Sequence, residues 1–174
     1  MKRFKPALLW MLAVPFFLAC EGEPGPPGPQ GNPGIVTVGL MYEVEFDLNS
    51  GNNWSQVYTF PPGDEILWED VVLVYLLNGE VDGKDLWRLM PVSFFSDAGT
   101  LNLNYDFTVD DVNIFAEASF PLDPNLDHFD NEIARIVVVP AAESPNFRKM
   151  PIDYSNFEEV KAAFNLKEPK KLSK

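Results

Sequence analysis

The stretch YEVEFDL, residues 42–48, alternates an apolar residue with an acidic residue at every step. A period of two places the apolar side chains on one face of a β-strand and the acids on the other. We therefore expect a half-buried strand over residues 36–48, with the alternation in its second half.

Apolar segments with turn signals between them continue from this strand up to Pro140. The turn sequence NSGNN, residues 49–53, precedes a predicted strand over 54–60. Residues 71–77 are continuously apolar and rich in β-branched side chains, the pattern of a central strand. The remaining predicted strands are 86–95, 101–107, 112–120 and 133–139.

About seven short strands with no helical period between them predict an all-β fold. The expected architecture is an antiparallel β-sandwich, either immunoglobulin-like or jelly-roll-like. The sandwich would occupy residues 35–140, and residues 141–174 would form a C-terminal extension.

One short helix is expected within this extension, near residues 155–165. Ser155 as N-cap and Glu158 at the third helical position would form a capping box. One face of the helix would carry Phe157, Val160 and Phe164. Residues 167–174 are predicted to be a frayed basic tail.

The N-terminal residues 1–19 have the pattern of a lipoprotein signal peptide. A basic start is followed by an apolar run that is too short to span a bilayer. Small Ala19 precedes Cys20, the only cysteine of the chain, which has no disulfide partner. The pattern predicts cleavage before Cys20 and stable anchoring through its acyl chains. The alternative is an ordinary secretory leader that leaves a free thiol.

Acidic residues follow the predicted anchor directly, because Glu21 and Glu23 lie just after Cys20. Glu21 occupies the position where an aspartate would retain a lipoprotein in the inner membrane. We therefore expect the protein in the outer membrane. Acidic residues directly after the anchor also accompany transport to the outer face of the cell, so the expected side is the cell exterior.

Residues 20–34 have the collagen period, with glycine at every third position and prolines between. The glycines are Gly22, Gly25, Gly28, Gly31 and Gly34. Only glycine fits at the axis of three packed chains, and proline pre-sets the extended angles of each chain. Two interpretations stay open: a stiff single-chain spacer, or a triple helix that makes the protein a homotrimer.

Charge is strongly segregated along the chain. Residues 20–160 contain 25 acids and 5 bases, a net charge of −20, whereas residues 161–174 have a net charge of +4. An acidic domain repels nucleic acid, so no nucleic-acid partner is expected. The lysines at the end would either be solvated or pair with a neighbouring copy.

Catalytic motifs are scarce. His128 is the only histidine, Cys20 is the predicted anchor, and no G-x-S-x-G motif occurs. We therefore do not expect an enzyme.

A calcium site is the better chemical hypothesis, because oxygen-bearing side chains alternate after residue 122. The proposed ligands are Asp123, Asn125, Asp127 and Asp130. Asn131 and Glu132 would extend a looser site. The pattern departs from a calcium loop at His128, where glycine is usual, and at Ala134, where a glutamate should close the loop. The alternative is a polar connection with an Asx-turn.

Three tryptophans, Trp54, Trp68 and Trp87, lie at turn edges or strand starts. There they would stack on sugar rings of a glycan, and packing into the core is the alternative.

Several segments together resemble the short collagen-like lipoproteins of Gram-negative bacteria. They are the start Cys20-Glu21-Gly22, the triplets to Gly34, DVVLVY (70–75), DLWR (85–88) with Pro91, RIVVVP (135–140) and YSNFEEV (154–160). The resemblance implies a β-rich domain and a place in the cell envelope. It implies no activity and no catalytic residue.

The leading hypothesis is a non-enzymatic surface lipoprotein with a structural or adhesive role. The alternative is a module that binds a glycan or another small ligand, with or without calcium. A hydrolase is the third hypothesis.

Overall fold

The alternating stretch forms strand β1, Leu40–Leu48, near the start of the described chain. The computed structural model describes residues 39–123, 129–140 and 151–172. The predicted signal peptide, Cys20 and the collagen-like stem lie outside these residues, as do Asn125, Asp127 and His128.

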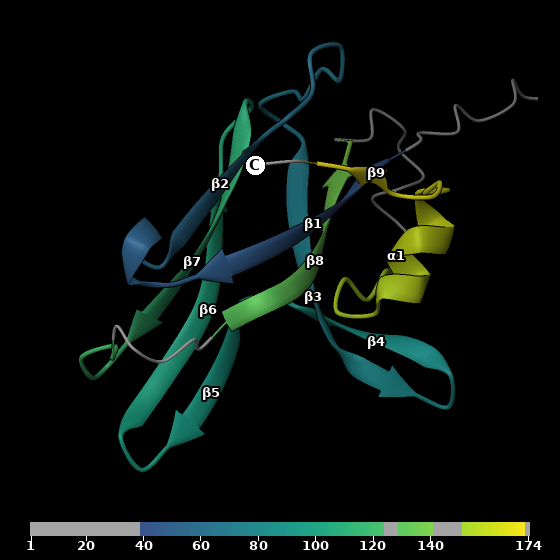
Figure 1. Ribbon diagram of the computed structural model, residues 1–174. Helices are drawn as coiled ribbons and strands as arrows, with labels where there is room; N and C mark the ends of the chain where they lie inside the picture. Colours follow the sequence, from purple (N-terminus) through teal and green to yellow (C-terminus); the bar gives the residue numbers. More distant parts are fainter. Residues whose placement is uncertain (1–38, 124–128, 141–150, 173–174) are drawn as a thin grey trace, which may run out of the picture. The chain divides into compact units, whose positions relative to one another are not determined.

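Nine strands form two sheets in the described part of the chain, so the all-β class is confirmed (Figure 1). Sheet A has the order β4 (Lys84–Leu89), β3 (Val71–Val81), β8 (Phe129–Val139), β1 and β9 (Lys170–Lys171). Sheet B has the order β2 (Ser55–Thr59), β7 (Asp111–Ala118), β6 (Gly99–Phe107) and β5 (Val92–Ser96). A short 3-10 turn, η2 (Ser50–Asn52), joins β1 to β2. All strand pairs are antiparallel except β1 with β9.

The main core lies between the two sheets, because every second residue of their strands is apolar. Sheet A contributes Tyr42, Val44, Phe46, Val72, Val74, Leu76, Ala134, Ile136 and Val138. Sheet B contributes Tyr58, Val92, Leu103, Val112 and Ile114. Burial of these side chains is the main contribution to stability.

A second core covers the other face of sheet A, where helix α1 (Phe157–Ala163) packs. In Figure 1, sheet B lies on the left, sheet A in the centre and α1 on the right. The sheet contributes Met41, Leu73, Tyr75, Trp87, Val137 and Val139 to this outer core. The helix and the residues after it contribute Phe157, Val160, Phe164 and Leu166.

The predicted strand over residues 86–95 is wrong, because it is two strands in different sheets. Strand β4 pairs with β3 in sheet A, and β5 pairs with β6 in sheet B. Pro91 lies between them, and a proline has no N–H group with which to continue a sheet ladder. Together with β9, this division raises the number of strands from about seven to nine.

The predicted helix start is wrong by one residue. Asn156 is the N-cap, and its side chain accepts hydrogen bonds from the backbone N–H groups of Glu158 and Glu159. Asn156 donates to the Glu159 carboxylate, while Ser155 donates to Asp153 instead of capping the helix. Asparagine and serine are both good N-caps, so the sequence NFEE offered a competing start.

The prediction of a frayed tail is wrong for the residues described. Lys170 and Lys171 form β9, which pairs in parallel with Tyr42 and Glu43 of β1. The Leu172 N–H donates to the Glu43 carbonyl, at 3.2 Å. The end of the described chain is therefore a strand of sheet A.

No helix among the described residues is both long enough and apolar enough to cross a membrane.

Candidate functional site

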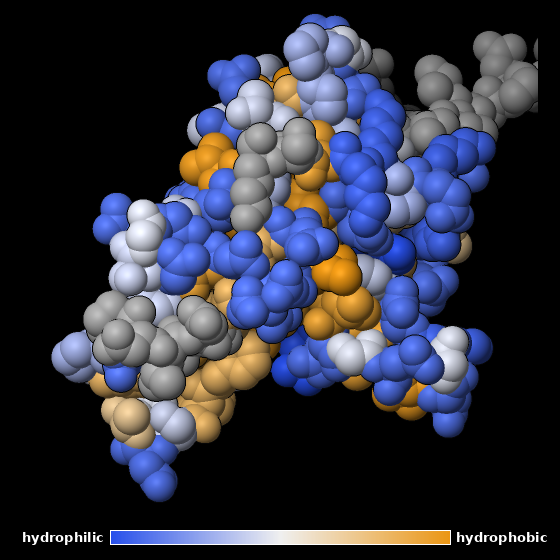
Figure 2. Space-filling view, in the orientation of Figure 1, coloured by the Kyte–Doolittle hydropathy of each residue, from blue (hydrophilic) through white to orange (hydrophobic). Residues whose placement is uncertain are grey.

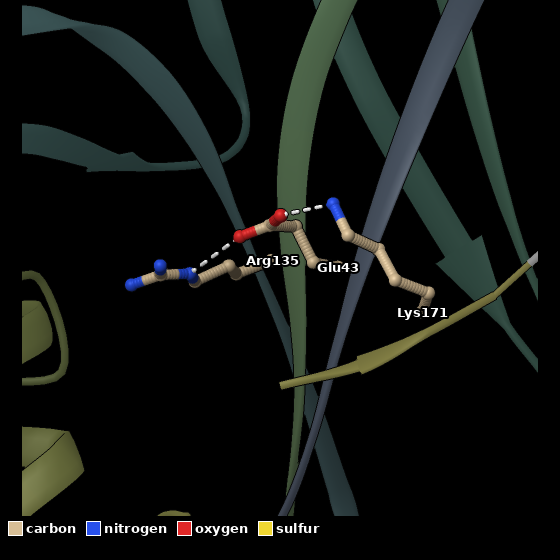
Figure 3. Close-up of polar contacts among 3 residues, drawn as sticks. All are labelled: Glu43, Arg135 and Lys171. Carbon is tan, nitrogen blue, oxygen red and sulfur yellow. Dashed lines mark hydrogen bonds and ion pairs between the residues drawn. The ribbon is translucent and has the colours of Figure 1, made fainter. Parts of the chain in front are cut away.

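A charged cluster on the outer face of sheet A joins β9 to its neighbour β1 and to β8, the next strand of the sheet. Figure 3 shows the Glu43 carboxylate between Arg135 and Lys171. The Arg135 Nε atom is 3.3 Å from Glu43 Oε2, and the Lys171 Nζ atom is 2.5 Å from Glu43 Oε1. Glu43 and Arg135 are direct cross-strand partners in β1 and β8, which places their side chains on one face.

Arg135 also covers the aromatic part of the outer core. Its guanidinium carbon lies 4.1 Å from the centre of the Trp87 ring and 5.2 Å from that of Phe157. A guanidinium over an aromatic face is attracted by the ring electrons. Arg135 thus links the ion pair to the packing of helix α1.

A second cation of β9 pairs on the inner side of β1. Lys170 Nζ is 2.7 Å from Asp64 Oδ2, and the Tyr42 hydroxyl donates to the same oxygen at 2.8 Å. The hydrogen bond from Lys170 is the main cause that lowers the pKa of Asp64, and the bond from Tyr42 adds to it. For Glu43, the hydrogen bond from Lys171 is likewise the main cause of a lowered pKa, and Arg135 lowers it further.

Glu43→Gln should make the free energy of unfolding less sensitive to acidic pH. Because the pKa of Glu43 is lowered by folding, its contribution is present above the ordinary carboxyl pKa of about 4.3 and is lost as the pH falls through the lowered value. At pH 7 we expect the variant to be less stable by about 1 kcal/mol, because the Glu43 side chain is only 16% exposed and its loss leaves Arg135 unpaired. Once the pH falls below the lowered pKa, the two proteins should converge, as measured by urea denaturation at pH 7 and at such an acidic pH.

Glu45→Gln is the matched control for this prediction. Glu45 is exposed and lies two residues along β1, so removing its charge should change the stability at pH 7 by less than Glu43→Gln does. A Glu43→Gln variant that stays less stable by the same amount at both pH values would contradict the role of the ion pair.

The three predicted ligand-binding tryptophans lie in different surroundings. Trp87 is 9% exposed in the outer core, and its ring centre lies 5.6 Å from that of Phe157. Trp54 is half-buried and packs against the main core. Trp68 is 87% exposed, in the connection between β2 and β3.

The calcium hypothesis falls partly outside the described residues. Asp130 lies in β8, and Asp123 lies between β7 and β8. Asn125 and Asp127 are not among the described residues. Within the described ranges, no three His, Cys, Asp or Glu side chains are grouped so that they would hold a metal ion. Calcium binding stays a prediction.

Sheet B presents a largely polar outer face, opposite to the side chains that enter the main core, and Val57 and Phe95 are exposed on it. The described helix packs on sheet A instead (Figure 1). Three short hydrogen bonds cross this face, Ser55 to Asn113 at 2.7 Å, Ser93 to Asn102 at 2.7 Å and Asn104 to Glu117 at 2.8 Å. Asparagine is uncommon in β-strands, so the three asparagines on this face, Asn102, Asn104 and Asn113, are unusual for a sheet.

A pocket of about 380 Å³ opens at one end of the main core. Its lining comes from β3, β5, β6 and β8, namely Leu76, Leu77, Asn78, Phe94, Leu101, Phe129 and Glu132. The last β3–β8 pair is Leu76 with Ala134, so the pocket lies where β3 separates from β8. In Figure 2, apolar colour gathers at the lower end of β5 and β6, beside a notch that separates them from the β3–β4 hairpin.

Glu132 is the one ionisable side chain among the described residues that line this pocket. Burial raises its pKa, which is the usual effect of desolvation on a carboxylate. The sequence contained a signal for this position, because Glu132 is in phase with the core residues Ala134, Ile136 and Val138. The charged cluster had no comparable signal, because Glu43, Arg135 and Lys171 are far apart in the chain.

Comparison with known proteins finds no matching family model, no matching curated protein and no matching solved structure.

Proposed function

We propose that this chain is a lipoprotein, anchored to the outer membrane through lipid on Cys20 and displayed at the cell surface in a structural or adhesive, non-enzymatic role. The observation that carries the proposal is the way the first strand of the domain is held. A displayed domain is pulled through its anchor, and in the sequence β1 begins at Leu40, shortly after the predicted stem ends at Gly34.

Strand β1 is an inner strand of sheet A, with β8 on one side and β9 on the other. Its start is also tied to the C-terminal segment, because the Gly39 N–H donates to the Phe164 carbonyl at 3.0 Å. A Cβ atom at Gly39 would lie 2.9 Å from the Val138 carbonyl oxygen and 2.6 Å from the Leu166 side chain. Only glycine allows this close approach.

A pull directed along β1 would act at an angle to its hydrogen bonds to β8 and β9, which run across the strand. The bonds then share the load and must break together. The Lys170 and Lys171 ion pairs, which join β9 to the β1 region, add to this resistance. A domain held in this way suits a protein that transmits force between an anchor and a bound surface.

The polar outer face of sheet B is the surface that such a domain would present to a partner. The stem would act as a spacer or a trimerising segment, and an immunoglobulin-like or jelly-roll-like subclass stays a prediction. The partner in this proposal is a protein or glycan.

Cys20→Ser should abolish membrane anchoring. In a Gram-negative host grown with labelled palmitate, the full chain should incorporate label, fractionate with the outer membrane and be cleaved by protease added to intact cells. The variant should lose all three, because one thioether at Cys20 is the predicted attachment of the acyl chains. Cells carrying the anchored protein should also attach to a glycoprotein-coated surface better than cells carrying Cys20→Ser.

Glu21→Gln serves as the control, because it changes the neighbouring residue and keeps the thiol. It should retain the label and the membrane fraction. Label that persists in Cys20→Ser would overturn the anchor. Anchored protein that protease cannot reach on intact cells would overturn surface display. Equal attachment of the two kinds of cell would overturn the adhesive role.

A further inference from the structure

The carboxylate of Glu132 points into the space between the two sheets. Glu132 is the cross-strand partner of Phe46, which is fully buried in the main core. Direct partners across a strand pair share a face, and residues two apart in one strand share a face as well. Ala134, two residues along β8, also lies in the main core. Both relations place the Glu132 side chain on the inner face.

Within the described residues, the Glu132 side chain forms no hydrogen bond or ion pair. Burial raises the pKa of this carboxyl. An inward carboxylate without a partner is unfavourable, because it loses hydration and gains no compensating contact. A cation in the pocket would supply that contact.

The rest of the pocket is suited to an apolar group. Leu76, Leu101, Phe94 and Phe129 form its walls. The ring centres of Phe94 and Phe129 lie 5.9 Å apart, with their planes inclined at 59°. Aromatic faces attract cations as well as apolar groups. A volume of about 380 Å³ lies in the range of small-molecule sites, which combine apolar walls with a few polar groups.

We propose that this pocket binds a small organic cation that carries an apolar group. The charged nitrogen pairs with Glu132, and the apolar group packs against the Phe94 and Phe129 side chains that line the pocket. This site goes beyond the proposed display function and does not depend on lipid attachment. Its ligand is selected by charge complementarity, because a neutral or anionic analogue leaves the carboxylate unpaired or repels it.

The test uses three probes of one size: 2-phenylethylamine, 2-phenylethanol and phenylacetate. Amide signals of the isotope-labelled full chain are followed by NMR during titration. The amine should produce saturable shifts at Leu76, Asn78 and Phe129. Phenylacetate should produce none there, and 2-phenylethanol should bind about tenfold more weakly than the amine, since it lacks the charge-assisted contact.

Glu132→Gln should weaken binding of the amine about tenfold and leave binding of the alcohol unchanged. The variant keeps the shape of the side chain and removes a partly desolvated charge, so its melting temperature should equal or exceed that of the wild type. Glu45→Gln is the charge-matched control at an exposed position, and its affinity for the amine should not change.

The competing explanation is that Glu132 only prevents the unpaired part of β8 from joining a strand of another copy, a known role of inward charges. That explanation predicts no saturable shifts at the pocket with any probe. Such a result would overturn the proposal, and so would equal affinity of Glu132→Gln and the wild type for the amine.

Discussion

Phe157→Ala is expected to lower the free energy of unfolding by about 3–5 kcal/mol. Phe157 is 3% exposed, and its ring centre lies 5.2 Å from that of Tyr75 in an edge-to-face arrangement. Trp87 and Arg135 pack on the same ring. Removing the ring leaves a cavity between α1 and sheet A, because the sheet cannot move to fill it. Urea denaturation followed by circular dichroism measures the loss.

Phe157→Leu is the matched control, because it keeps most of the volume and should cost less than about 1.5 kcal/mol. The contrast isolates packing from helix propensity. If alanine and leucine gave the same small change, below about 1 kcal/mol, helix α1 would not be a layer of the folded domain.

Ending the chain after Leu166 is expected to lower the free energy of unfolding by about 2–3 kcal/mol. The deletion removes β9 and its backbone hydrogen bond to Glu43. It also leaves the carboxylates of Glu43 and Asp64, each 16% exposed, without their lysines. An exposed ion pair contributes at most about 1 kcal/mol, and a partly buried acceptor that loses its donor costs about 1–3 kcal/mol.

A chain that ends after Leu172 is the control for this truncation. It retains β9 and should be as stable as the full chain in the same urea titration. Equal stability of the Leu166 and Leu172 truncations would show that β9 does not contribute to the folded state.

The strands around the main core could be predicted because the burial of their side chains produces a recognisable apolar pattern in the sequence. Residues 42–48 alternate because β1 has one face in the main core, and residues 71–77 are continuously apolar because β3 is buried on both faces. The end of β4 was not recognised because residues 86–95 are mostly apolar on both sides of Pro91. Local composition does not record which of two sheets a strand joins.

The C-terminal strand could not be predicted because its partners are distant in sequence. Lys171 pairs with a residue 128 positions earlier, and Lys170 with one 106 positions earlier. Two lysines near a chain end have the composition of a solvated tail. The pairing of β9 with β1 brings Lys171 beside Glu43 and Lys170 within reach of Asp64.

Only part of the pocket could be predicted from the sequence. The phase of Glu132 with Ala134 indicates an inward carboxylate, but the same residue also fitted the looser calcium site. The end of the core is a pocket because β3 separates from β8 beyond Leu76. That separation is a property of two strands far apart in the chain.

The place of β1 between β8 and β9 also sets the order in which the protein acquires its structure. The first strand to emerge during synthesis has its partners about 90 and 128 residues later. Closing such long loops is slow, and folding rates fall as contacts become less local. Sheet A therefore cannot be completed until almost the whole chain is available.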